Sequence, residues 1–261
     1  HDALPSGWRL LASTGCNPVI AAGMVYSTAI ATAAKEFHGT TFAIIDAEVP
    51  GPNVASLVFA AEQGSYLAGV IAASASKTGK IGFIGGMDIP LINAFKAGYV
   101  QGAKSVNPNI MVETAYLGAA GDAAAWNSPE IAKSITEMMI TNSVDVGYAV
   151  AGASNTGMFQ ALKAAGGRWG IGVDSDQYTV PSLTGVKEVI LTSMLKRVDS
   201  AVFEVIKSVA TGSPMTGVQN FDLKRGGVGY AVSNPVVAPY QAAADAAAAK
   251  IISGEIKVMT Q

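Results

Sequence analysis

The sequence has few of the side chains that metal sites and catalytic clusters need. It contains one cysteine, Cys16, and two histidines, His1 and His38. A single cysteine excludes a disulfide within the chain, and we expect Cys16 to be a buried free thiol. His38 follows a predicted helix, where a capping role accounts for it. No group of histidines and cysteines has metal-ligand spacing, so the sequence predicts no metal, no cofactor and no catalytic residues.

Charge and long apolar runs are also scarce. Charged residues make up 14% of the chain, and the net charge is −2. Because nucleic-acid-binding proteins usually carry a basic stripe, we expect no nucleic acid partner. No apolar run reaches the roughly 18 residues of a membrane helix. The first residues show neither an initiator methionine nor the pattern of an export signal, so we expect any such signal to lie outside this sequence.

Glycine is abundant, with 29 residues, and many glycines border short apolar runs. The clearest example is the run 81–84, which lies between Gly79 and the pair Gly85 and Gly86. A short apolar run between glycines predicts a buried parallel strand. We expect the glycine pair to form a turn and Pro90 to begin the helix that follows.

The same strand–turn–helix unit recurs along the chain. Strands are expected near residues 18–23, 41–45, 54–59, 81–84, 110–117, 144–150, 169–173 and 189–193, with short strands in 221–232. Helices are expected near residues 5–13, 25–37, 62–76, 90–106, 129–141, 155–164, 201–210 and 235–253. This alternation predicts an α/β fold with parallel sheets and helices on both faces. We expect two lobes that share a cleft, one from residues 1–108 and about 194–226, the other from 109–193 and about 227–261.

Polar side chains stand where several predicted strands end. Asp46, Asp174 and Lys196 each directly follow an apolar run, and Asp176 stands two residues beyond Asp174. Open α/β sheets bind ligands at this edge, and a carboxylate there can accept hydrogen bonds from two adjacent hydroxyls. Trp126, in a predicted loop before a helix, offers a flat face for stacking. Together they favour a neutral, hydroxylated, planar ligand such as a nucleoside, although capping or packing roles remain open for each residue.

Seven segments, in matching order along the chain, carry a resemblance to a known family. They are residues 42–46, 53–59, 64–70, 82–90, 170–177, 192–198 and 226–229. From about Cys16 to its end, the chain is similar to the basic membrane protein family of substrate-binding lipoproteins, the purine nucleoside receptor type that serves ABC importers. The resemblance implies two Rossmann-like lobes hinged around a cleft, a purine nucleoside as ligand and an ABC permease as membrane partner. It also implies an extracytoplasmic location, with a lipid anchor in the precursor.

The resemblance further implies roles for individual residues. Asp46, Asp174 and Lys196 would hold polar atoms of the ligand, with Asp174 on the ribose hydroxyls. Trp126 would stack on the base, Gly152 would allow a close backbone approach, and Met24 would line the wall. The predicted ligand-binding residues are therefore Met24, Asp46, Trp126, Gly152, Asp174, Asp176 and Lys196.

The sequence departs from the family pattern at its start. Family members begin with a strand, a helix and a second strand, which normally supply a second stacking aromatic beside an asparagine, and an aspartate. No counterpart of that segment, or of the lipid-anchored cysteine, is expected here, since Cys16 lies inside the matching region. The first lobe would then have an unpaired sheet edge, a site for aggregation or strand swapping.

Two other functions remain open from the residues alone. One is an α/β hydrolase that acts on nucleosides. Asp174 and Asp176 are the closely spaced carboxylates that such an enzyme would use. The other is a ligand-sensing regulatory protein of the same fold. The scarcity of histidine and cysteine favours a binding protein over an enzyme.

Overall fold

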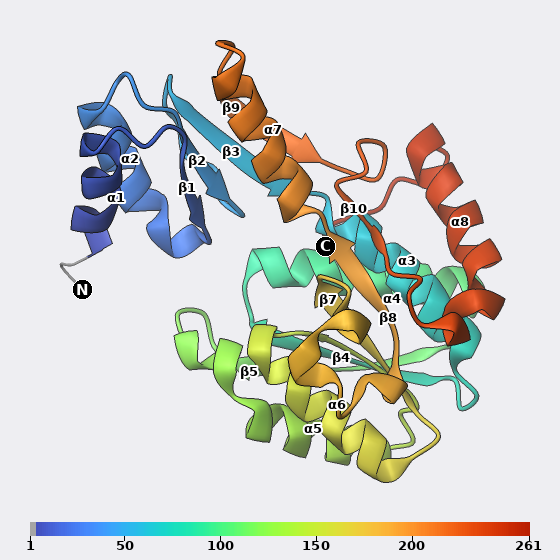
Figure 1. The fold of residues 1–261 in the computed structure, drawn as a ribbon. Helices are drawn as coiled ribbons and strands as arrows, with labels where there is room; N and C mark the ends of the chain where they lie inside the picture. Colours follow the sequence, from blue (N-terminus) through green and yellow to red (C-terminus); the bar gives the residue numbers. More distant parts are fainter. Residues whose placement is uncertain (1–3) are drawn as a thin grey trace. The chain divides into compact units, whose positions relative to one another are not determined.

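The structure, a computed structural model, describes residues 4–261 and consists of two compact units (Figure 1). The smaller unit comprises the residues up to Ala60 together with Arg197–Gly227. The larger unit comprises Ala61–Lys196 and Val228–Gln261. Each unit contains a mainly or wholly parallel sheet with helices, which confirms the predicted α/β fold. Among the helices of residues 4–261, none combines the length and apolar character that a bilayer span requires.

The smaller unit is built on a four-stranded parallel sheet. Its strands, in spatial order, are β1 (Val19–Ala22), β2 (Phe42–Ile45), β3 (Val54–Phe59) and β9 (Gly217–Phe221). Its helices are α1 (Leu4–Ser13), the 3-10 turn η1 (Met24–Tyr26), α2 (Ser27–Glu36) and α7 (Val198–Ala210). Ile30 from α2 packs with Phe42 and Ile44 from β2 and Val54 from β3 in the core. The burial of every residue of β2 explains its uninterrupted apolar sequence.

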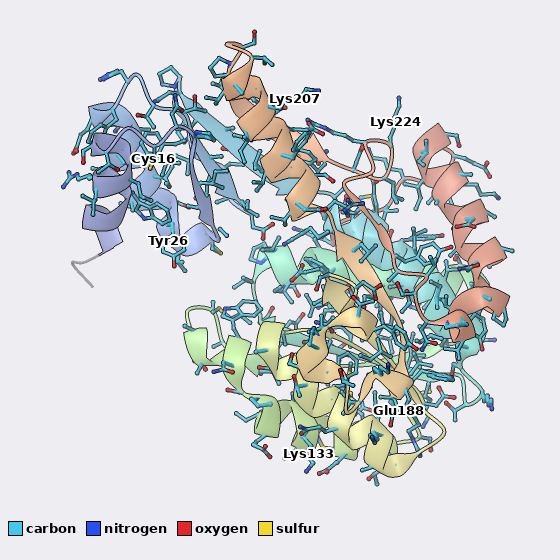
Figure 2. The ribbon with its side chains drawn as sticks, in the orientation of Figure 1. Cys16, Tyr26, Lys133, Glu188, Lys207 and Lys224 are labelled. Carbon is cyan, nitrogen blue, oxygen red and sulfur yellow. The ribbon has the colours of Figure 1, made fainter. Side chains whose placement is uncertain are left out.

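The expectation of a buried Cys16 needs correction. Cys16 is exposed rather than buried, because it lies in the turn between α1 and β1 (Figure 2).

At the end of α2, the Asn53 side chain donates hydrogen bonds to Ala34 O, Phe37 O and Thr40 O, at 3.1, 3.1 and 2.8 Å. This one amide therefore satisfies carbonyl groups that a helix end leaves without partners.

The larger unit is built on a six-stranded sheet in which one edge strand runs antiparallel. The order is β10 (Val228–Tyr230), β8 (Ile190–Lys196), β7 (Trp169–Asp174), β6 (Val146–Val150), β4 (Lys80–Met87) and β5 (Met111–Gly118), with β10 antiparallel to β8. Its helices are α3 (Ala61–Ala75), α4 (Pro90–Val106), α5 (Pro129–Thr141), α6 (Asn155–Ala165) and α8 (Ala238–Ser253). Figure 1 shows α5 and α6 on one face of the sheet, and α3 and α4 on the other.

The division between the units differs from the expected lobe boundaries at its first point. The chain first leaves the smaller unit after Ala60, whereas a boundary near residue 108 was expected; the later divisions, after Lys196 and Gly227, lie close to the expected ones. The reason is strand pairing, because β4 lies between β5 and β6 in the larger sheet. The segment from α3 to α4 therefore belongs to the larger unit. Similar βα repeats give no sequence signal for which sheet a strand joins.

The expected turn at Gly85 and Gly86 is also corrected by the structure. Both glycines lie inside β4, which continues to Met87. A Cβ atom on Gly85 would lie 2.6 Å from the Tyr116 ring, and one on Gly86 would lie 2.4 Å from the Trp126 ring. The glycine pair thus provides room for two aromatic rings against the strand, rather than a change of chain direction.

Helices α3 and α4 pack closely because glycines line their contact. Gly98 and Gly102 stand one turn apart on α4. A Cβ on either would lie 2.0 Å from a backbone oxygen of α3, Glu62 O or Tyr66 O respectively. Since real Cβ atoms do not approach an oxygen so closely, the contact requires glycine. Gly69 makes the same kind of contact from α3, because a Cβ there would lie 2.1 Å from Tyr99 O.

We expect Gly102→Ala to lower the free energy of unfolding of the larger unit by about 1–3 kcal/mol, because the added methyl group forces α3 and α4 apart. The loss should exceed the gain in helix propensity of up to about 1 kcal/mol. Urea denaturation followed by circular dichroism measures it. Gly229→Ala is the matched control, since nothing lies within 4 Å of a Cβ there. Equal stability of the two variants would contradict the close-contact argument.

Candidate functional site

The predicted ligand-binding residues gather at the carboxyl edges of the two sheets. In the smaller unit, Asp46 directly follows β2 and Met24 lies in η1, after β1. The larger unit holds the other five: Asp174 and Lys196 end β7 and β8, Asp176 lies just beyond β7, Trp126 lies in the 3-10 helix η2 (Ala123–Asn127) after β5, and Gly152 begins the 3-10 turn η3 (Gly152–Ser154) after β6. The structure thus brings these five to one edge of one sheet, as the parallel strands require.

Asp174 and Lys196 form an ion pair across the ends of neighbouring strands. The Lys196 Nζ atom lies 3.4 Å from Asp174 Oδ1, and the side chains are 9% and 52% exposed, respectively. Strands β7 and β8 pair in parallel, with Asp174 opposite Leu195, so both side chains reach the same edge. The separation is longer than a tight charge-assisted hydrogen bond of about 2.7–2.9 Å. The half-exposed carboxylate therefore keeps acceptor sites that can face a ligand.

The backbone at Asp174 and Asp46 has an unusual conformation. Their φ angles are 67° and 62°, in the left-handed region that residues other than glycine seldom adopt. Ser143 is the other such residue in the part of the chain that the structure describes. Both aspartates occupy the position where a parallel strand ends, one in each sheet. Backbone strain of this kind concentrates at functional sites, which supports these two residues as candidates.

Asp176 has a structural partner at the end of β7. Its Oδ2 atom accepts a hydrogen bond from the Ser233 hydroxyl, in the segment after β10. The Gln177 backbone N–H donates to Ser193 Oγ on β8, at 3.0 Å. These bonds fix the loop that begins with Asp174. The ligand-binding role of Asp176 stays a prediction, and the contacts show a second role in holding this loop.

The Trp126 indole packs against β4. A Cβ on Gly86 would lie 2.4 Å from Cζ3 of the indole, so the ring covers a surface that only glycine leaves open. Gly152 has a φ of 59°, and a Cβ there would lie 3.1 Å from Trp126 O. The indole is half-buried, so part of it stays accessible. Trp126 is therefore a packed ring with an accessible part, and its stacking role stays a prediction.

Sequence reasoning missed a buried serine beside this tryptophan. Ser154 is fully buried, donates a hydrogen bond to Ala125 O at 2.8 Å and accepts one from Ser128 N at 2.7 Å. Ser128 occupies the position before α5, with Pro129 first in the helix, but its hydroxyl donates to Ala124 O at 2.7 Å and caps no helix N–H. Local backbone carbonyls compete for serine hydroxyls in this way.

A second missed group lies where β4 and β5 end. The Tyr116 hydroxyl donates to Asn93 Oδ1, and Asn93 Nδ2 donates to Asp88 Oδ1 at 2.9 Å. The Lys96 ammonium lies 5.4 Å from the centroid of the Tyr116 ring. Asp88 follows β4 directly and is exposed, so this network ends at the same sheet edge. A tyrosine in a strand and an asparagine in the preceding helix give no sequence signal of their contact.

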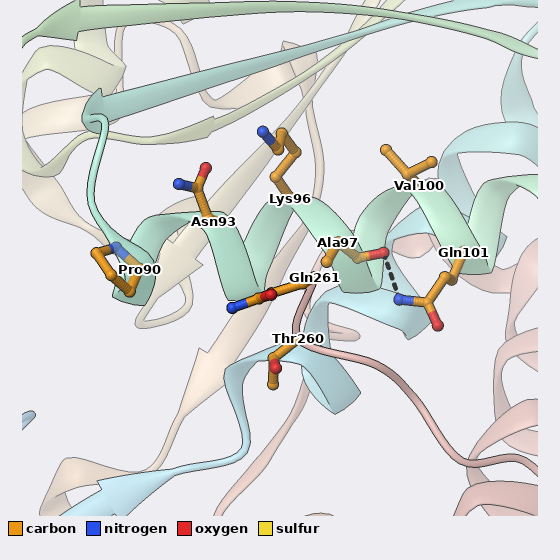
Figure 3. Close-up of a pocket in the computed structure, with 8 residues that line it drawn as sticks. All are labelled: Pro90, Asn93, Lys96, Ala97, Val100, Gln101, Thr260 and Gln261. Atoms are coloured by element: carbon orange, nitrogen blue, oxygen red, sulfur yellow. Dashed lines mark hydrogen bonds between the residues drawn. The ribbon is translucent and has the colours of Figure 1, made fainter.

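A hollow of about 460 Å³ lies along α4, and none of the predicted ligand-binding residues lines it (Figure 3). Its lining consists of Pro90, Asn93, Lys96, Ala97, Val100, Gln101, Thr260 and Gln261. The Gln101 amide donates to Met259 O at 2.7 Å and accepts from Met259 N at 3.0 Å. The hollow is therefore a crevice between a helix and the chain segment that Gln101 holds beside it.

The titratable groups with shifted pKa values include no evident acid–base pair. Burial raises the pKa of the Tyr148 and Tyr99 hydroxyls, which therefore stay neutral. Tyr148 Oη lies 3.1 Å from Ser65 Oγ, so the two hydroxyls satisfy each other in the core. Among residues 4–261, no group of three or more histidine, cysteine, aspartate and glutamate residues is placed to hold a metal ion.

Comparison with protein families gives a match over nearly the whole chain. A sequence model of the family described as ABC transporter substrate-binding protein PnrA-like matches residues 6–261. The ABC transporter nucleoside-binding protein BmpA of Lactococcus lactis is 35% identical, over 99% of this chain and 73% of that protein. Basic membrane protein A of Borreliella burgdorferi is 33% identical, over 95% of this chain and 72% of that protein.

Solved structures show the same fold. An ABC transporter solute-binding protein from Aeropyrum pernix K1 is 26% identical, with a TM-score of 0.82 over 100% of this chain and 82% of that chain. A transcriptional activator of the comK gene from Bacillus halodurans is 25% identical, with a TM-score of 0.80 over 95% of this chain and 82% of that chain.

Proposed function

Because the chain belongs to the ABC transporter substrate-binding protein PnrA-like family, we propose that it binds a purine nucleoside and serves an ABC importer for its uptake. The observation that carries the ligand class is the combination of a stacking ring and a strand-end carboxylate in the larger unit. The relative from Lactococcus lactis, described as nucleoside-binding, supports the same class.

The geometry suits a ligand with an aromatic part and a hydroxylated part. The half-buried Trp126 offers a flat apolar surface, and base–aromatic stacking tolerates different bases because each has a π-face. Asp174 offers a half-exposed carboxylate beside the Lys196 ammonium. An ionised carboxylate accepts from two hydroxyls, whereas an ammonium donates to ligand oxygens. The ion pair keeps this corner near neutral, which favours an uncharged nucleoside over an anionic nucleotide.

The proposed partner is an ABC permease in the membrane, and the proposed location is outside the cytoplasm. The family description supports both. A lipid anchor in the precursor belongs to the same proposal. The contributions of Met24 and Asp46 to ligand binding stay predictions. Both residues belong to the smaller unit, whereas Trp126 and Asp174 belong to the larger unit.

Thermal denaturation with a panel of nucleosides, free bases and sugars tests the ligand class. Adenosine, guanosine or inosine should raise the melting temperature, because a ligand that binds only the native state stabilises it by mass action. Ribose alone and adenine alone should raise it less. Chromatography of the same samples should detect no free base. A response to sugars but not to nucleosides would contradict the proposal, and release of free base would favour a nucleoside hydrolase that uses Asp174 and Asp176.

A regulatory role is a second candidate, and one observation favours it. The structure described as a transcriptional activator has a TM-score of 0.80 to this chain at 25% identity. A ligand-sensing protein would use the same strand-end residues but a different partner. Isolation of the protein with a membrane permease would separate the two roles, because a transcriptional regulator has no need of that partner.

We expect Trp126→Ala to weaken nucleoside binding by about 1–3 kcal/mol, the range for base–aromatic stacking. Binding of ribose should hardly change, since ribose has no ring to stack. Isothermal titration calorimetry measures both. Trp169→Ala is the matched control, because Trp169 begins β7 while Asp174 ends it, roughly 17 Å away. Equal losses for nucleoside and ribose would show that Trp126 acts only in packing.

We expect Asp174→Ala to cost about 2–4 kcal/mol of nucleoside affinity, if two charge-assisted hydrogen bonds are lost and water recovers part of the energy. A 2′-deoxynucleoside should bind the native protein less tightly and lose less on mutation. Calorimetry with the two ligands and two proteins isolates this coupling. Asp245→Ala, an exposed aspartate on α8, serves as the control. If both sugars lose equal affinity, Asp174 does not bind the ribose diol.

A further inference from the structure

The peptide groups around Trp126 are held by one buried hydroxyl. Ser154 Oγ donates to Ala125 O at 2.8 Å and accepts from Ser128 N at 2.7 Å. These two backbone atoms lie one residue before Trp126 and two residues after it. Ser154 has no exposed surface, so water cannot replace the hydroxyl without a rearrangement. One side chain thus brackets the residue that offers the stacking surface.

Ser154 is itself fixed to the central part of the sheet. The next residue, Asn155, is 1% exposed, and its Nδ2 donates to Ala149 O on β6 at 3.1 Å. Its Oδ1 accepts from Ala151 N at 3.1 Å, in the turn that leads to η3. The hydrogen bonds of two adjacent residues, Asn155 and Ser154, therefore connect β6 with the Trp126 segment. Such a connection transmits the rigidity of a central strand to a loop that follows an edge strand.

The segment that carries Trp126 needs this support. It is a five-residue 3-10 helix, and residues 119–124, which lead into it and begin it, are exposed. Short 3-10 helices have poorer hydrogen-bond geometry than α-helices. The indole meets Gly86, and the Trp126 carbonyl approaches Gly152. Small displacements of the backbone at Ala125 or Ser128 would therefore lift the ring from the strand.

We propose that Ser154 is a positioning residue for ligand binding, which holds the Trp126 indole against Gly86 before a ligand arrives. The inference rests on the proposed stacking role of Trp126. Ser154 itself contacts backbone rather than ligand. Its contribution is preorganisation: a ligand that must first select a rare ring position binds with an apparent affinity reduced by the fraction of competent molecules.

The test uses Trp126 as its own reporter. In a Trp8→Phe/Trp169→Phe background, Trp126 is the one tryptophan left. Ser154→Ala should shift its emission to longer wavelength and increase quenching by acrylamide, because the ring leaves Gly86. If the competent fraction falls to about a tenth, the nucleoside Kd rises about tenfold. The Kd of ribose should stay unchanged.

Thr136→Val is the matched control. Thr136 is 3% exposed, and its hydroxyl donates to Ala132 O within α5 at 2.7 Å. Both substitutions delete a buried hydroxyl of the larger unit, so both should lower stability. The control should leave Trp126 emission and nucleoside affinity unchanged. If Ser154→Ala fails to fold, Ser154→Cys, which keeps the size with a weaker donor, provides the same comparison.

A double-mutant cycle completes the test. In a Trp126→Ala background, Ser154→Ala should cause no further loss of nucleoside affinity, because no ring remains to be positioned. Equal losses with and without Trp126, or unchanged Trp126 emission in Ser154→Ala, would overturn the proposal. If the native protein binds no nucleoside, the proposed function fails, while the emission and quenching comparison still decides whether Ser154 holds the ring.

Discussion

Parallel strands impose the constraint on which the larger unit depends. Each strand needs a crossover that returns the chain to the opposite end of the sheet, so the carboxyl ends of all parallel strands meet at one edge. Asp174 and Lys196, 22 positions apart in sequence, are therefore neighbours at that edge. The loops after β5 and β6, with Trp126 and Gly152, reach it by the same rule. The chemistry of the edge follows from strand order rather than from any local motif.

Glycine residues determine how closely side chains and helices pack in the larger unit. Gly86 lets an indole lie on β4, and Gly102 lets two helices meet with backbone against backbone. In one place the indole ring, and in the other the backbone of α3, occupies the space that a side chain would take, so the interior stays close-packed. The high glycine content thus reflects close contacts within strands and helices, and turns account for only part of it.

Much of the fold could be predicted from the sequence, because apolar runs and helical spacing report burial directly. β2 and β7 match their apolar runs closely, whereas β9 was missed since it is a largely exposed edge strand without an apolar pattern. The position of the first division, after Ala60, also escaped prediction. It depends on which sheet β4 joins. The sequence of β4 itself does not indicate which strands it pairs with.

The candidate site likewise contains residues that the sequence predicts and residues that it does not. Asp174 and Lys196 could be found because a charged residue at the end of an apolar run is conspicuous. Ser154 could not, because a serine in a polar turn resembles an ordinary cap, and its two bonds reach a segment about thirty residues earlier. Asp88, Asn93 and Tyr116 are similar: each is unremarkable alone, and their network exists only after β4 and β5 pair.

The threefold passage of the chain between the units has a consequence for biosynthesis. Strand β3 pairs with β9, so Ala55 lies opposite Gly217 in the smaller sheet. During translation, β1, β2 and β3 leave the ribosome long before their fourth strand exists, and all of residues 61–196 emerge in the interval. Closing so long a loop is entropically costly, and unpaired strand edges are prone to aggregation. The nascent smaller unit therefore presents an open edge at β3 while residues 61–196 are synthesised, a period in which a chaperone has a defined surface to protect.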